Sequence, residues 1–161
     1  PMYTLVEELM IPSLSDWEPA REALFNHPDF PDWYKEFQLL VEVGRNDFYT
    51  LEGECRDWSR PGAIVVRQAY QALKWQIRPA IELIQRYGAL LETFGAGRNP
   101  RILTDLSGPM FQVIIEVETD GLTEWEQQRR LLFREADFQV WFAQLVNRVE
   151  AGAHTFYRVE K

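Results

Sequence analysis

The chain carries an internal repeat, and this repeat limits the possible fold more than any other feature. When residues 1–53 are laid on residues 109–161 without a gap, eighteen of the 53 pairs are identical, where chance gives about three. Most identical pairs are apolar or aromatic and include Trp17/Trp125, Leu24/Leu132, Phe25/Phe133, Phe30/Phe138, Trp33/Trp141 and Tyr49/Tyr157. The repeat predicts that one supersecondary unit occurs twice in the chain.

Each copy is predicted to fold as strand, helix, strand. Apolar and polar side chains alternate over residues 110–118, which is typical of a strand with one buried face. The first copy has a similar but less regular strand over residues 2–10. The closing strands are expected over residues 46–53 and 154–160.

The helical segment between these strands has the same start signal in both copies. Residues 15–18 and 123–126 both read as capping boxes of the form Ser/Thr-x-x-Glu. Pro28 and Pro31 are expected to break the first helix in its middle, because proline cannot donate an intrahelical hydrogen bond. Gly44 and Gly152 are expected to end the helices.

The order of the predicted elements gives the fold class and the domains. Residues 63–161 read β-α-β-β-α-β, the ferredoxin-like order with antiparallel sheets. Residues 1–53 form a β-α-β half-repeat, and residues 54–62 are a polar linker. The predicted class is therefore α+β, with a half-module before a complete module. The half-module lacks the strand that would lie between its own two, so another part of the chain, or a partner chain, is expected to fill that slot.

Composition excludes several classes of partner. The formal net charge is −8, which disfavours nucleic acid and anionic membrane surfaces. No apolar run approaches the about 20 residues of a membrane span, and we expect no signal peptide. The single cysteine, Cys55, is expected to be a free thiol in a reducing compartment. These features predict a cytoplasmic protein.

Four segments carry a resemblance to a known family: Arg67–Tyr70, Ser107–Ile114, Leu122–Glu126 and Asp137–Trp141. The stretch from Arg67 to the C-terminus resembles the dimeric α+β-barrel superfamily. It is most similar to the NIPSNAP branch, and next to the antibiotic-biosynthesis-monooxygenase branch. Phe111 stands where the NIPSNAP pattern has asparagine, so no role is carried over to that position.

The resemblance implies a homodimer in which two sheets face each other and enclose a barrel lumen for small hydrophobic molecules. It implies cofactor-independent chemistry of the monooxygenase or isomerase type, with no cofactor expected. The N-terminal half-repeat departs from the usual single or fully doubled arrangement, so a simple homodimeric barrel is not assured by the resemblance.

Polar side chains on the strand faces are the best candidates for a ligand site. Gln112 and Glu116 alternate with the apolar face of their strand, and Arg67 lies on the first strand of the complete module. Thr4 and Glu8 are the repeat partners of Gln112 and Glu116. In a lumen, a partly desolvated carboxylate could act as a general base. The alternative is a solvated polar sheet face with no ligand.

The remaining candidates are weaker. His154 could be a base or haem ligand, although a lone histidine at a strand start is more often an edge residue. Trp75 has no repeat partner, so a ligand contact is less excluded there than at the tryptophans that both copies share. Arg98 and Arg101 flank a glycine-rich loop that follows a helix, whereas a phosphate-binding loop precedes a helix. These arginines could instead meet a carboxylate. No metal-ligand spacing occurs, so no metal site is expected.

Two functions follow from these observations. The first is a small-molecule binder or enzyme with a lumen lined by Arg67, Gln112 and Glu116. The second is a non-catalytic interaction or assembly protein, whose lumen is filled by Met110, Ile114 and their neighbours. The sequence does not decide whether the chain is an enzyme. A cavity of about 300 Å³ or more with convergent polar groups would favour the first function.

Overall fold

The computed structural model describes residues 4–54 and 60–160, in two compact units that divide between Asn46 and Asp47. Cys55 and most of the predicted linker lie outside the described residues. Each unit is described by itself. Within the described residues, no helix is long and apolar enough to cross a membrane.

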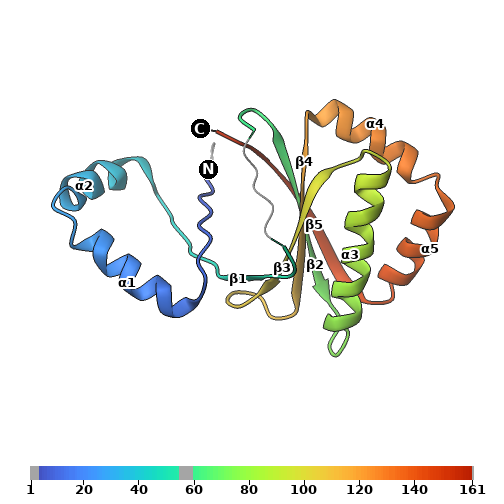
Figure 1. The fold of residues 1–161 in the computed structure, drawn as a ribbon, viewed down its shortest axis with the longest axis horizontal. Coiled ribbons are helices and arrows are strands. Elements are labelled where there is room, and N and C mark those ends of the chain that lie inside the picture. Colours follow the sequence, from blue (N-terminus) through green and yellow to red (C-terminus); the bar gives the residue numbers. More distant parts are fainter. Residues whose placement is uncertain (1–3, 55–59, 161) are drawn as a thin grey trace. The chain divides into compact units, whose positions relative to one another are not determined.

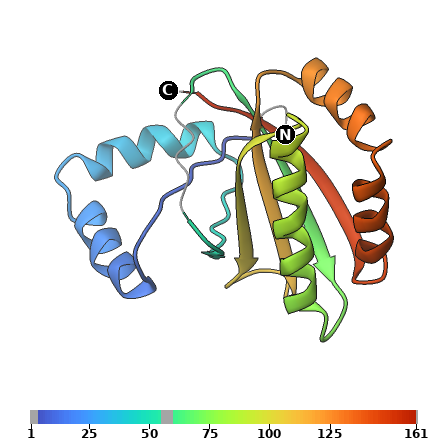
Figure 2. The same cartoon turned by 45° about the vertical axis from the view of Figure 1, so that its right-hand side comes forward.

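The larger unit is one antiparallel sheet with three helices on one face (Figures 1 and 2). Its elements, in chain order, are β1 (Tyr49–Leu51), β2 (Ile64–Ala72), α3 (Ile77–Thr93), β3 (Arg98–Asp105), β4 (Gln112–Thr119), α4 (Leu122–Leu132), α5 (Ala136–Leu145) and β5 (Val149–Arg158). The strand order is β1-β3-β4-β2-β5. Without β1, this is the ferredoxin-like arrangement with the first strand between the third and the fourth. The predicted α+β, ferredoxin-like class is confirmed.

Strand β1 joins the edge of this sheet beside β3, where Thr50 pairs with Thr104. It lies within the stretch predicted as the closing strand of the half-repeat. The contact with β3 assigns β1 to the larger unit. The predicted half-repeat, residues 1–53, therefore extends into the larger unit, which begins at Asp47. The sequence does not reveal this pairing because it joins segments about fifty residues apart.

The core lies between the sheet and the three helices. Helix α3 turns one apolar stripe inward, with Ala80, Ile84, Tyr87 and Leu91 at most 4 % exposed. Phe138 and Trp141 of α5 pack on Tyr87, and the Trp141 and Tyr87 rings stack with centroids 4.1 Å apart. Trp141 also donates from Nε1 to the Leu83 carbonyl at 2.7 Å.

Gly152 has a different role from the predicted helix end. It lies inside β5, opposite Tyr70 of β2. A Cβ on Gly152 would stand 3.2 Å from the Tyr70 ring, so glycine leaves room for the aromatic side chain. Helix α5 ends earlier, at Leu145, and β5 therefore starts before the predicted strand.

The smaller unit contains α1 (Leu14–Phe25) and α2 (Phe30–Leu40). The predicted break lies between them, and Pro31 sits in the first turn of α2, where its missing N–H has no cost. Helix α1 starts at Leu14 and α4 at Leu122, one repeat length apart. Both starts precede the predicted capping boxes, because Ser13 and Gly121 occupy the N-cap positions. The described part of the first predicted strand, residues 4–10, forms no strand.

Candidate functional site

Three ionic side chains meet on the sheet face opposite α3, α4 and α5, here called the far face. Glu116 of β4 pairs in register with Arg67 of β2 on one side and Arg101 of β3 on the other. Because side chains alternate along a strand, this register puts all three on one face. Arg67 Nη1 donates to Glu116 Oε1 and Arg101 Nη2 donates to Oε2, both at 2.9 Å. We call these three residues the ionic cluster.

Two members of the ionic cluster are buried, and Arg67 is half-buried. Glu116 is 0 % exposed and Arg101 is 9 % exposed. The Arg67 guanidinium carbon lies 5.0 Å from the centroid of the Tyr49 ring, so β1 adds an aromatic surface to the cluster. Ile114, next to Glu116 on the far face, is 1 % exposed, whereas Met110 is largely exposed.

The geometry restricts what the ionic cluster can do chemically. Each carboxylate oxygen of Glu116 accepts a hydrogen bond from a guanidinium. Charge-assisted bonds of this kind hold the carboxylate as an anion and give it a fixed orientation. This arrangement suits a positioning role for Glu116 better than proton abstraction, so its predicted role as a general base has no support from its contacts.

A second ionic group lies at the end of β4. Arg98 donates to both carboxylate oxygens of Asp120, at 3.0 and 2.8 Å, and Arg60 contacts the same carboxylate. Asn99 Nδ2 donates to Glu118 at 3.4 Å. Arg98 and Arg101 therefore both contact carboxylates, but Arg98 pairs with Asp120 and Arg101 pairs with Glu116.

A polar network also crosses the core on the helix side. The Tyr70 hydroxyl donates to Gln68 Oε1 at 2.8 Å, and Gln68 Nε2 donates to the Tyr87 hydroxyl at 3.3 Å. Burial raises the pKa of Tyr70 and that of Tyr87. Both phenols are therefore neutral hydrogen-bonding groups near neutral pH.

The predicted site residues separate into those near the ionic cluster and those away from it. The structure brings Arg67 and Glu116 together, and adds Arg101 and Tyr49, which were not predicted for this site. Gln112 is on the same face of β4 but pairs with Gln71, and its backbone N–H donates to Asp105 at 2.8 Å. The hairpin register between β3 and β4 was the signal that could have added Arg101 to the set.

The other candidates lie elsewhere. His154 is on β5 opposite Gln68, and its ring meets Trp125 edge to face at 6.1 Å. Burial, then the nearby Arg129 guanidinium, lowers the pKa of His154. Trp75, before α3, is 82 % exposed, with the Lys74 ammonium 5.4 Å from its ring. Thr4 and Glu8 are exposed residues of the smaller unit.

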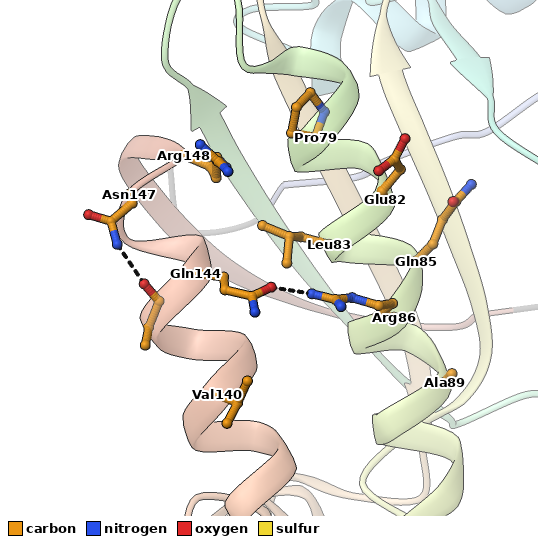
Figure 3. A pocket seen from close by; sticks show the side chains of 11 residues that line it. Pro79, Glu82, Leu83, Gln85, Arg86, Ala89, Val140, Gln144, Asn147 and Arg148 are labelled. Atoms are coloured by element: carbon orange, nitrogen blue, oxygen red, sulfur yellow. Dashed lines mark hydrogen bonds between the residues drawn. The ribbon is translucent and has the colours of Figure 1, made fainter.

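Two surface hollows are lined by none of the ionic cluster residues. The larger, about 970 Å³, is an open groove between α3 and α5, where Leu83 and Val140 lie between polar side chains (Figure 3). Arg86 and Gln144 are hydrogen-bonded across it. The smaller, about 410 Å³, is lined by Glu52, Arg78, Ile81 and Glu82. Within the described residues, no three His, Cys, Asp or Glu side chains group to hold a metal.

Comparison with known proteins connects this fold to solved structures. No protein-family profile and no curated protein matches the chain. A NIPSNAP domain protein from Burkholderia xenovorans, itself uncharacterised, superposes with a TM-score of 0.51 at 18% identity, over 58% of this chain and 91% of its own. A NIPSNAP family protein of unknown function from Agrobacterium tumefaciens gives 0.54 at 10% identity, over 64% and 93%.

A third solved structure belongs to the other predicted branch. It is a candidate antibiotic biosynthesis monooxygenase from Nitrosomonas europaea, with a TM-score of 0.51 at 9% identity, over 63% of this chain and 94% of its own. At such identities the likeness concerns the fold alone. The chain is thus similar in fold to NIPSNAP-family proteins and to this monooxygenase-like protein, as its sequence predicted.

Proposed function

We propose that the chain is a non-catalytic assembly protein that pairs with a second copy of itself through β5. One observation carries the proposal. β5 is the last strand of its sheet, is ten residues long, and has eight residues exposed and the other two half-buried. No Asp, Glu, Lys or Arg lies between Glu150 and Arg158, and an uncharged edge of this length favours pairing with another strand.

The charges at the ends of β5 fit such a pair. In an antiparallel pair centred on His154, Glu150 of one copy faces Arg158 of the other, and the same contact recurs at the opposite end. Opposite charges placed directly across two strands are stabilising. A two-fold pair of this kind is self-complementary, as a homodimer requires.

The ionic cluster supports the non-catalytic assignment. Both carboxylate oxygens of Glu116 are engaged by arginines, and Ile114 beside it is buried. The two hollows described above are lined by other residues. The acidic charge and the single cysteine favour a cytoplasmic location for this assembly.

Light scattering after size exclusion tests the pairing. We expect a mass of twice the 19.0 kDa chain. Glu150→Arg would set like charges opposite each other and weaken the dimer roughly tenfold, and the double variant Glu150→Arg, Arg158→Glu would restore it. The control is Gln127→Arg, which adds a charge at an exposed position of α4. A monomeric wild type, or a double variant that remains dissociated, would refute the proposal.

A second function has its own observation, the convergence of two arginines and one glutamate on the far face. A buried ion pair is weak evidence for a stabilising role, and convergent guanidinium groups are well suited to recognise a carboxylate. This favours binding of a small organic acid on the far face, in a lumen completed by a second copy. A cofactor-independent monooxygenase or isomerase would be the enzymatic version.

Native mass spectrometry of the freshly purified protein distinguishes the two functions. A bound organic acid that is lost in Arg67→Gln, and retained in Arg130→Gln on the surface of α4, would favour binding. Protein whose mass equals that of the chain or its dimer alone, before and after incubation with benzoate, would favour assembly.

A further inference from the structure

In the described part of the smaller unit, apolar side chains lie at the surface and form no core. Neither α1 nor α2 contains a buried residue. Five aromatic side chains, here called the aromatic face, follow one another from the end of α1 along α2: Phe25, Phe30, Trp33, Tyr34 and Phe37. Neighbouring ring centroids in this series are 4.7 to 5.6 Å apart. Phe25, Trp33 and Tyr34 are exposed, and Phe30 and Phe37 are half-buried. A contiguous apolar surface of this kind marks an interaction site.

The repeat shows what the same residues do when they are covered. Trp33 is 52 % exposed, whereas its repeat partner Trp141 is 4 % exposed. Leu24 is 54 % exposed, whereas Leu132 is 0 % exposed. The sequence of the second copy packs against a surface, and the described first copy presents the same residue types to solvent.

A helix supplies the covering surface in the second copy. Tyr87 of α3 stacks on Trp141, and the Leu83 carbonyl accepts the Trp141 indole N–H. Residues 4–46, the described part of the smaller unit, form α1, α2 and their flanking segments and supply no third helix for Trp33 to pack against. The occupant that fits the aromatic face is therefore an amphipathic helix.

Charge identifies the kind of helix. Residues 4–46 contain nine Asp and Glu but three Lys and Arg, a balance of −6 within a chain of −8. On α2, Glu36 lies three residues after Trp33 and therefore on the same side of the helix, whereas Asp32 pairs with Lys35. A second copy of this unit would be repelled, and α3 of a second copy already packs on its own α5. The complementary partner is basic.

We propose that the aromatic face binds a basic amphipathic helix of another protein, which packs on Trp33 as α3 packs on Trp141. This surface shares no residue with β5, so it adds a second kind of partner to the self-pairing described above. Its apolar contacts supply affinity, and its carboxylates select for positive charge.

Synthetic peptides and the full-length chain test the proposal. The probe is a labelled peptide of residues 76–94, the α3 sequence, carrying Glu82→Lys and Glu92→Lys to make it basic. The matched acidic peptide carries Arg78→Glu and Arg86→Glu. By fluorescence anisotropy we expect the basic peptide to bind, the acidic peptide not to bind, and affinity to fall as salt is raised.

Variants of the chain locate the binding. Trp33→Ala should weaken binding of the basic peptide about tenfold or more, and Glu36→Lys should weaken it while reducing its salt dependence. Exposed Trp75→Ala is the control and should bind as the wild type does. Glu36→Lys changes no aromatic contact, so it tests the surface even where Trp33→Ala disturbs α2.

Three results would overturn the proposal: no binding of the basic peptide, equal binding of both peptides, or binding that Trp33→Ala leaves unchanged. The β5 pairing is judged separately, because Glu150→Arg should weaken the dimer and leave peptide binding unchanged. If Trp33→Ala instead dissociates a dimer of the wild type, the aromatic face is a self-interface and the basic partner is refuted.

Discussion

Glu116 is the residue that both arginines of the ionic cluster contact on the far face. It sits between Arg67 and Arg101 on the central part of the sheet, with both oxygens hydrogen-bonded. Removing one member of a buried ionic set leaves its partners uncompensated, which costs far more than the set itself contributes. The two arginines therefore make this glutamate hard to replace.

Glu116→Gln should lower the free energy of unfolding by on the order of 3 kcal/mol. The amide keeps the shape but removes the negative charge that both guanidinium groups contact. The matched control is Glu126→Gln, which removes the exposed partner of Arg130 and should cost about 0.5 kcal/mol or less. Urea unfolding followed by circular dichroism measures both, and equal effects would contradict the buried role of Glu116.

Tyr70 and Tyr87 should make the protein sensitive to alkali. Their pKa values are raised by burial, so the folded state keeps protons that the unfolded state releases from about pH 10 upward. Stability is therefore full below that pH and falls as the pH rises through and above it. Absorbance at about 295 nm should show two of the six tyrosines titrating only on unfolding. Tyr70→Phe should remove one of them.

Gly152 tests close packing on a strand. Gly152→Ala should destabilise the protein by roughly 1–3 kcal/mol, because the new Cβ meets the Tyr70 ring. Tyr70→Leu in the same chain should recover part of the loss by opening the space. Thermal unfolding of the single and double variants decides the matter. Additive losses would show that the two residues are not coupled.

Among the elements, those with strong local periodicity were predictable. β4 lies within two residues of the predicted range 110–118, since it carries a regular apolar alternation. β2 and α3 occur in the predicted order of elements. The start of α1 was placed too late because Ser13, not Ser15, is the N-cap. The pairing of β1 with β3 and the place of Gly152 inside β5 depend on distant segments, which a local pattern does not contain.

The site divides in the same way. Arg67 and Glu116 were predictable because they alternate with apolar residues on strands, and the structure brings them together. Arg101 and Tyr49 were not predicted to belong to the ionic cluster. The register of β3 against β4 places Arg101 there, and the pairing of β1 with β3 places Tyr49 there. His154 and Trp75 had no periodic signal, and they lie away from the cluster.

Hydrogen exchange should separate the elements by their burial. Amides of β4 should exchange slowest, since this strand is central and seven of its eight residues are buried. Amides of α1 and α2 should exchange much faster than those of α4 and α5, although the repeat makes their sequences alike. Mass spectrometry of peptic fragments gives the rates. Equal protection of the two helix pairs would contradict the exposure of α1 and α2, and the basic peptide should slow exchange in α2.

At the scale of the whole molecule, the residues that the structure describes form a core-bearing unit and a smaller unit without a core. Nineteen buried residues form the cluster between the sheet and α3, α4 and α5. A unit that buries so little of its own apolar surface gains stability chiefly from whatever binds it. This asymmetry gives the two copies of the repeat different tasks, folding for one and recognition for the other.

Limited trypsin digestion should reveal the asymmetry. We expect early cleavage after Arg21, Lys35 and Arg45, which lie in the smaller unit, and survival of a product that contains β2 through β5. Gel and mass analysis over time identifies the products. Early loss of β4 peptides would contradict the assignment of the core.

The ionic cluster has one further consequence, for the way the sheet assembles. Glu116 faces an arginine on each neighbouring strand only when β4 is aligned with both, and a slip by one residue would turn its carboxylate among Tyr87, Val66 and the other apolar groups beneath the helices. Mispaired forms of the hairpin are thus rejected by electrostatics as well as by shape.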